Sequence, residues 1–84
     1  MTSALHGAST LEVEVTNVSN HGFWLLLGPE ELFVSFADFP WFKDARIGQL
    51  TNVERPQPHH LYWPDLDVDL SVDSIRRPHE FPLV

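Results

Sequence analysis

The sequence predicts a single α+β domain built on an antiparallel sheet, and three observations lead to this prediction. The chain has 84 residues, which suffice for one hydrophobic core and leave no room for a second. Hydrophobic residues make up 43% of the chain, so the composition is not that of a disordered protein. Short apolar segments alternate with turn residues, and two short helical patterns interrupt them. We expect about five strands, arranged as a three-stranded meander and a second hairpin, with two short helices.

The first half of the chain predicts the meander. In "LEVEVTNV", Leu11, Val13 and Val15 alternate with polar residues, as in a half-buried strand. The run "FWLLL" is apolar on both faces, which is typical of a more central strand, and "LFVSF" predicts a third. The turn sequences "SNHG" and "GPEE" separate these segments, so neighbouring strands should be antiparallel.

Prolines mark the boundaries in the middle of the chain. Pro40 suits the first position of a helix, which we expect to run to about Ala45. A second helical turn over residues 47–50 is compatible with the sequence, although Gly48 weakens it. The segments "TNVER" and "HHLYW" predict the second hairpin, with the intervening "PQP" in its turn because proline donates no strand hydrogen bond.

The segment "DLDVDLSVDSIRRP" predicts an extended ribbon followed by a short helix. Three aspartates alternate with apolar residues in the ribbon: Asp65, Asp67 and Asp69. Asp69 or Ser71 should cap the helix, and Pro78 should end it. We place the domain at residues 10–78, between a flexible N-terminal tail at 1–9 and a C-terminal tail at 79–84.

The charge balance favours some partners over others. Five basic residues stand against twelve acidic ones, which gives a net charge of −7 with neutral histidines. Such a surface repels phosphate backbones and anionic lipid, and it attracts a basic protein. Direct binding of nucleic acid is therefore not expected, because the only basic cluster, Arg76 and Arg77, has aspartates close by. Contact with nucleic acid through a partner complex is compatible with this charge.

The same composition bears on location and assembly. The chain has no cysteine, which excludes disulfides and fits a cytoplasmic protein. The start of the chain lacks a signal-peptide pattern, and no apolar run is long enough to span a bilayer, so we expect no membrane partner. A domain this small gains stability from association, so a homo-oligomer is compatible with the sequence.

The aspartates resemble the opening of a calcium loop, but the rest of that motif is missing. The sixth position requires glycine and holds Leu70, while the twelfth requires glutamate and holds Arg76. We therefore expect Asp65 and Asp67 to be exposed and free of bound ions. His59 and His60 are adjacent, so on a strand they point to opposite faces and do not grip one metal.

Motifs for catalysis are also missing. The sequence has neither a nucleophile elbow nor a glycine-rich phosphate loop. We expect no enzyme activity and no cofactor. The alternative is that folding brings carboxylates and histidines together. The chain would then be a small carboxylate- and histidine-based enzyme or a metal-binding protein.

Two tryptophans are candidates for contact with a partner. Trp41 and Trp63 each adjoin a proline, and a half-exposed tryptophan in such a position makes a good interface anchor. With the acidic ribbon they form the predicted partner-binding set: Trp41, Trp63, Asp65, Asp67 and Asp69.

The segment "LYWPDLDVDLSVDSI" resembles a bacterial family of small proteins, domain of unknown function 2442. The family shows a Trp-Pro, an acidic and apolar segment ending in Asp-Leu, and a closing short helix, and "VSFADFPWFKDARIGQLTNVE" is similar to its middle section. The resemblance covers about residues 11–76. The common form has a glycine-bearing "WPNG" where this chain has Asp65 and Leu66.

The resemblance implies a compact α+β fold with an antiparallel sheet and short helices, and no known catalytic residue. Genes of such proteins often lie beside another small gene, which implies an antitoxin-like role in a toxin–antitoxin pair, or a mobile-element origin. We therefore expect a small acidic protein-interaction module that neutralises a basic partner protein encoded nearby.

Overall fold

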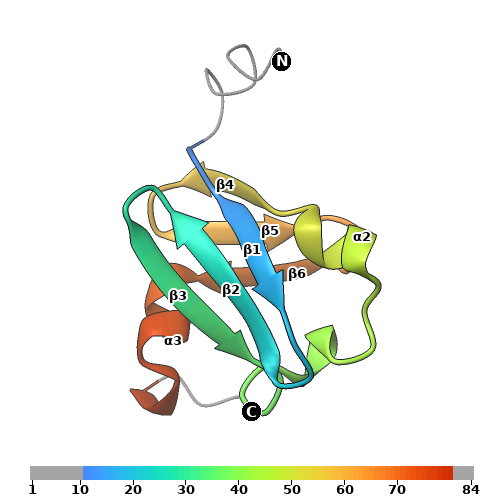
Figure 1. The fold of residues 1–84 in the computed structure, drawn as a ribbon. Coiled ribbons are helices and arrows are strands. Elements are labelled where there is room, and N and C mark those ends of the chain that lie inside the picture. The colour runs from blue at the N-terminus through green and yellow to red at the C-terminus, as the bar shows by residue number, and fades with distance from the viewer. Residues whose placement is uncertain (1–10, 81–84) are drawn as a thin grey trace.

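The computed structural model describes residues 11–80, which form two three-stranded antiparallel sheets and several short helices (Figure 1). In chain order the elements are β1 (Glu14–Val18), β2 (Gly22–Leu27), β3 (Glu30–Ser35), the 3-10 turn η1 (Pro40–Phe42), α2 (Ile47–Thr51), β4 (Glu54–Gln57), β5 (His60–Trp63), β6 (Val68–Ser71), α3 (Val72–Arg76) and the 3-10 turn η2 (Pro78–Glu80). Within the described part of the chain, no helix has the length and apolar character needed to cross a membrane.

The α+β class and the first meander are confirmed, but the prediction of about five strands in one sheet is wrong. Six strands form two sheets, with the orders β1-β2-β3 and β4-β5-β6. The segment between β3 and β4 contains η1 and α2, and it carries the chain from one sheet to the other (Figure 1). Each sheet buries only one face, so two small sheets facing each other can share a single core.

The first sheet has β2 at its centre, as the apolar run predicted. Phe23 pairs with Val34, and both side chains are fully buried. Trp24 pairs with Phe33 on the opposite, outer face. β1 has an irregular register between Val15 and Asn17, which is a β-bulge at this edge of the sheet.

In the second sheet the third strand, β6, comes from the segment that the sequence predicted as an extended ribbon. Leu61 pairs with Leu70, and Trp63 pairs with Val68, so the apolar side chains of the ribbon turn inward. Alternation alone did not show that this ribbon would pair with β5.

The prolines of the second hairpin only partly occupy the predicted place. Pro58 lies in the turn, but Pro56 lies within β4. The register of β4 against β5 shifts between Glu54 and Gln57, which flank this proline. A proline is tolerated at such an irregularity because no regular strand hydrogen bond is required of it there.

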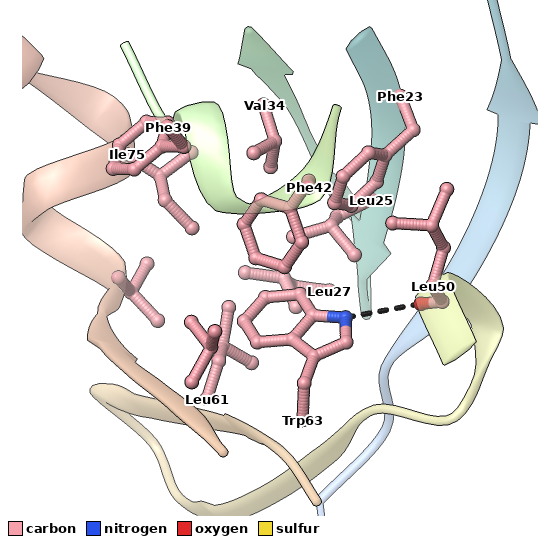
Figure 2. Packing of buried hydrophobic residues seen from close by; sticks show 12 residues of the cluster. Phe23, Leu25, Leu27, Val34, Phe39, Phe42, Leu50, Leu61, Trp63 and Ile75 are labelled. Carbon is pink, nitrogen blue, oxygen red and sulfur yellow. Dashed lines mark hydrogen bonds between the residues drawn. The ribbon is translucent and has the colours of Figure 1, made fainter. Parts of the chain in front are cut away.

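The core lies between the two sheets and is closed at its sides by the helices (Figure 2). Its buried residues are Phe23, Leu25, Leu27, Val34, Phe39, Phe42, Leu50, Leu61, Trp63, Val68, Val72 and Ile75. Among the described residues no polar or charged side chain is buried apart from the indole N–H of the core tryptophan.

Trp63 lies at the centre of this core, which corrects its predicted half-exposed position. Its exposed fraction is 0%, and its ring centroid lies 4.8 Å from that of Phe42 and 6.3 Å from that of Phe23. The indole N–H donates to the carbonyl oxygen of Leu50 at 3.0 Å, as Figure 2 shows. That bond satisfies the polar atom of an otherwise apolar side chain, so the ring can be buried completely.

Candidate functional site

A tight turn joins β5 to β6 and positions the acidic segment. Trp63 and Val68 are the last pair of the two strands, and the N–H of Leu66 donates to the carbonyl oxygen of Trp63 at 3.2 Å. Asp67 has a φ of 53°, in the left-handed region, which lets the chain reverse. The predicted extended ribbon is therefore wrong for Asp65 and Asp67, which lie in the turn, and right for Asp69, which lies in β6.

The three aspartates do not form one cluster. All three are exposed, as predicted for Asp65 and Asp67. The Oδ2 atom of Asp65 accepts a hydrogen bond from Nδ2 of Asn52 at 2.9 Å. Asp69 Oδ1 lies 2.5 Å from Nε2 of His60 on the neighbouring strand. Asp65 and Asp69 thus contact different residues on different elements.

Asp67 and Asp69 line a shallow depression at the edge of the second sheet. Its volume is about 380 Å³, and its lining consists of Trp41 and residues 66–70. Side chains of consecutive strand residues point to opposite faces. Residues 68–70 of the lining are consecutive in β6, and residues 66 and 67 belong to the turn, so the depression runs along the backbone edge of β6 and not over one face of the sheet.

Trp41 forms the aromatic wall of this depression. Its side chain is 48% exposed, which confirms the predicted half-exposed position. Its ring centroid lies 6.1 Å from that of Phe39 and 6.5 Å from that of Phe42, and both phenylalanines are core residues. The turn η1 thus packs one side of the indole on the core and leaves the other side exposed to solvent.

Of the five residues in the predicted partner-binding set, the structure brings three together at this depression: Trp41, Asp67 and Asp69. Asp65 lies outside the lining, at the Asn52 contact. Trp63 is buried and cannot touch a partner while the protein is folded. It nevertheless supports the site, because its pairing with Val68 holds the start of β6.

The contact between His60 and Asp69 is the arrangement closest to a catalytic one. Ser71 lies opposite His60 in the register, so a carboxylate, an imidazole and a hydroxyl share the outer face of the second sheet. Ser71 Oγ accepts from the N–H of Ser74 at 3.2 Å as the cap of α3, and within residues 11–80 no hydrogen bond joins this hydroxyl to His60. Within residues 11–80 no group of three or more histidines and carboxylates is arranged to hold a metal ion.

The two arginines form ion pairs within the protein. Arg76 makes two hydrogen bonds to Glu30 through Nε at 2.8 Å and a terminal nitrogen at 2.6 Å, and a third to Asp73 at 3.0 Å. These contacts lower the pKa of Glu30 below its ordinary value, chiefly through the hydrogen bonds from Arg76. Arg77 lies 3.7 Å from Asp73 and 3.6 Å from Glu80. Carboxylates thus face both cations.

Sequence reasoning missed an aromatic pair on the outer face of the first sheet, formed by an exposed Trp24 and a half-buried Phe33. Trp24 is 41% exposed, and its ring centroid lies 5.1 Å from that of Phe33. The signal lay in the neighbouring strands: Leu26, on the same face, pairs with Glu14 and Glu31. Two charged neighbours mark this face as directed to solvent.

A second depression, of about 370 Å³, lies where Glu12 and Glu14 approach Leu26 and Gly28. It has two carboxylates but no aromatic side chain in its lining. The depression beside Trp41 combines acidic groups with an apolar surface, so it is the stronger candidate for binding a protein.

Comparison with known families gives a match over most of the chain. The model of the family described as a protein of unknown function (DUF2442) matches residues 12–81. The comparisons with curated proteins and with solved structures found no match.

Proposed function

Because the chain belongs to the family of domain of unknown function 2442, whose description states no activity, we propose a function from its surface. The protein is a bacterial, cytoplasmic interaction module that binds a basic partner protein. Its role is that of the antitoxin-like member of a toxin–antitoxin pair, with the partner encoded nearby.

The observation that carries this proposal is the depression at the edge of β6. An exposed Trp41 lies there beside two exposed carboxylates, those of Asp67 and Asp69. Tryptophan is among the residues that most often dominate binding energy, because it buries a large apolar area with little loss of conformational freedom. The carboxylates select a partner with lysine or arginine at the matching position.

The charge of the whole chain supports the same choice of partner. With a net charge of −7, the protein attracts a basic surface over a distance of about one Debye length, roughly 8 Å at physiological salt. Arg76 and Arg77 add little positive field, because acidic side chains lie within 4 Å of both. Association should therefore be fast at low salt and slow at high salt.

Neutralisation follows from the kind of surface that such a partner needs. A toxin that acts on RNA or DNA requires basic residues to hold the phosphate backbone. An acidic protein bound to those residues removes them from the nucleic acid. Inhibition by this route needs no catalytic group in the antitoxin.

Affinity purification of the tagged protein from its native host tests this proposal. We expect one small basic protein, encoded by a neighbouring gene, to copurify, and its expression alone to arrest growth. Coexpression of the wild-type chain should restore growth. Purification of the chain alone, together with a neighbouring gene product that is harmless by itself, would contradict the proposal.

Matched variants locate the binding surface in the same assay. Trp41→Ala combined with Asp67→Asn and Asp69→Asn should lose the partner. Glu12→Gln combined with Glu54→Gln removes the same number of charges from exposed positions outside the depression, and it should retain the partner. Equal loss in both variants would assign binding to net charge and not to this depression.

A further inference from the structure

We infer that the partner presents an extended basic segment that pairs with the free edge of β6 and becomes a fourth strand of the second sheet. This inference rests on the proposed function and specifies how the partner is held. The segment lies in the depression between β6 and Trp41.

The hydrogen-bonding pattern of β6 leaves backbone groups directed outward. The N–H of Val72 donates to the carbonyl oxygen of His59 at 2.9 Å, which makes this pair a hydrogen-bonded one. Hydrogen-bonded pairs alternate along antiparallel strands. Leu70 therefore turns its backbone groups toward β5, while Asp69 turns its N–H and C=O away from β5 and toward the depression.

Within residues 11–80, no turn, loop or side-chain hydrogen bond involves the backbone N–H or C=O of Asp69. Ser71 likewise lies in a pair that turns its N–H outward. An unpaired edge of this kind is a template for another strand, and proteins use it to bind extended peptides.

The other edge strands are less suited to pairing with an added strand. The N–H of Leu11 donates to the carbonyl oxygen of Arg55 at 3.1 Å, which occupies part of the edge of β4. α3 packs against β3, and Arg76 joins the two elements through Glu30. The β-bulge between Val15 and Asn17 distorts β1. The edge of β6 combines a regular register with an adjoining depression lined by an exposed aromatic ring.

The side chains beside this edge determine which segment fits. A residue placed opposite Asp69 points to the same outer face as that carboxylate, where lysine or arginine forms a cross-strand ion pair. The residues on either side of it point to the inner face, which is the face of Val68 and Leu70. The edge therefore selects a segment in which basic and apolar residues alternate.

The length of the edge explains why side chains are needed. Asp67 has left-handed backbone geometry, so regular pairing stops there, and α3 begins directly after Ser71. Backbone pairing can form only over the few residues between these two points. Most of the affinity must come from Trp41 and the carboxylates, and the backbone fixes the orientation of the segment.

A synthetic peptide of alternating lysine and valine residues tests this inference, with binding followed by amide NMR of the full-length protein. We expect chemical-shift changes concentrated at residues 66–71 and at the indole N–H of Trp41. A peptide of the same composition, with the lysines and valines in separate blocks, should bind at least fivefold more weakly. Equal binding of the two peptides, or shifts centred on the outer face around Trp24, would overturn the inference.

Backbone methylation separates strand pairing from charge attraction. In an extended peptide the N–H groups of alternate residues point to the same edge. If the segment runs antiparallel to β6, N-methylation of every lysine should abolish binding and N-methylation of every valine should preserve it. Loss of binding only in the valine-methylated peptide would also support strand pairing, with the segment parallel to β6. An equal effect of the two methylated peptides would overturn the inference.

A matched pair of charge reversals places the segment on the sheet. Glu54, Tyr62 and Asp69 lie in one row across the second sheet, on β4, β5 and β6. Asp69→Lys should weaken the alternating peptide roughly fivefold or more, because a favourable cross-strand pair becomes a repulsive one. Glu54→Lys makes the same change at the opposite edge, and binding should stay within about twofold of wild type.

Failure of this inference is distinguishable from failure of the proposed function. If the copurified partner binds Asp69→Lys and Trp41→Ala as tightly as the wild type, it uses another surface, and the edge-pairing inference is overturned while the proposed function stands. If no basic partner exists but the alternating peptide still pairs at β6, the proposed function fails while recognition of extended basic segments stands.

Discussion

At the scale of single residues, Asp67 has the most constrained backbone in the acidic segment. Its φ of 53° is in the left-handed region, where a Cβ atom crowds the following carbonyl group. Aspartate tolerates this geometry better than most residues, and glycine tolerates it best. The turn that presents the edge of β6 therefore depends on a conformation that few side chains accept.

We expect the Asp67→Gly variant to be more stable than the Asp67→Ala variant, by about 1 kcal/mol in the free energy of unfolding. Urea denaturation of both variants measures the difference. Asp65 serves as the control, because its φ is not positive and alanine should be at least as stable as glycine there. An Asp67→Ala protein as stable as Asp67→Gly would show that the turn does not require left-handed geometry in solution.

Ser71 connects the edge strand to α3. Its Oγ atom accepts from the N–H of Ser74 at 3.2 Å, which confirms the helix cap predicted from the sequence. Ser71→Ala should lower the free energy of unfolding by about 0.5–2 kcal/mol, because one N–H of the first helical turn loses its acceptor. Thermal and urea denaturation measure this loss.

The matched control for the cap is Ser74→Ala. This change removes the hydroxyl that donates to the carbonyl oxygen of Ser71 at 2.7 Å. It keeps the backbone N–H that donates to Oγ of Ser71. The loss of stability should be smaller than for Ser71→Ala. The opposite order would mean that the hydroxyl of Ser74, and not the cap, holds the start of α3.

At the scale of elements, Arg76 links α3 to β3 across 46 positions of sequence. The hydrogen bonds from Arg76 lower the folded-state pKa of Glu30 below its ordinary value of 4.5. A carboxyl group with a lowered pKa stabilises the fold above its unfolded-state pKa, and this contribution is lost as the pH falls through the folded-state value. The pair is more than one-third exposed, so its contribution is modest, roughly 0.5–1 kcal/mol.

We therefore expect the melting temperature of wild type to fall more between pH 7 and pH 3 than that of Glu30→Gln, when both are measured at low salt. Glu31→Gln is the control, because Glu31 is the next residue on β3, is exposed and forms no ion pair with another described residue. If Glu30→Gln and Glu31→Gln show the same acid dependence, the link between α3 and β3 contributes nothing measurable to stability.

The elements that the sequence predicted well are those fixed by neighbouring residues. Ser71 was identifiable as a cap from the helix that follows it, and β2 as a central strand from its own apolar run. The partner of β6 was not identifiable in this way, because Val68 and Leu70 are compatible with an isolated ribbon as well as with a strand beside β5. Likewise, the contact between Arg76 and Glu30 depends on how two distant elements meet.

The candidate site, like the fold, was only partly predictable from the sequence. A proline neighbour did not decide exposure, because Trp41 beside Pro40 is half exposed whereas Trp63 beside Pro64 is buried. The acidic residues were recognisable as a surface feature, but the free backbone edge between them depends on the pairing of β6 with β5. Local sequence could not reveal it, because an edge is a property of the order of strands in a sheet.

At the scale of the whole molecule, two sheets without a shared strand must be held together by their core. The indole of Trp63 extends from β5 across the interface (Figure 2), where it packs against Phe23 and Phe42 and bonds to the carbonyl oxygen of Leu50. One side chain thus contacts the first sheet, η1 and α2. Its proline neighbour resembles that of Trp41, but its environment is opposite, since one ring is buried and the other is half exposed.

Substitution of each tryptophan by phenylalanine tests this contrast between a buried and a half-exposed ring. Trp63→Phe removes the N–H donor, leaves the buried carbonyl of Leu50 without its partner and opens a small cavity, so it should lower the free energy of unfolding by about 2–4 kcal/mol. Trp41→Phe makes the same chemical change at a side chain that is 48% exposed, and it should cost less than about 1 kcal/mol. Urea denaturation of the two variants gives both values. In the binding assays the order should reverse: at a temperature where both variants are folded, Trp63→Phe should bind the basic partner as wild type does, and Trp41→Phe should bind it more weakly because less apolar surface is buried. Two tryptophans with equal effects on stability would mean that the sheets are not joined through Trp63, and a stronger binding defect in Trp63→Phe would move the partner away from the edge of β6.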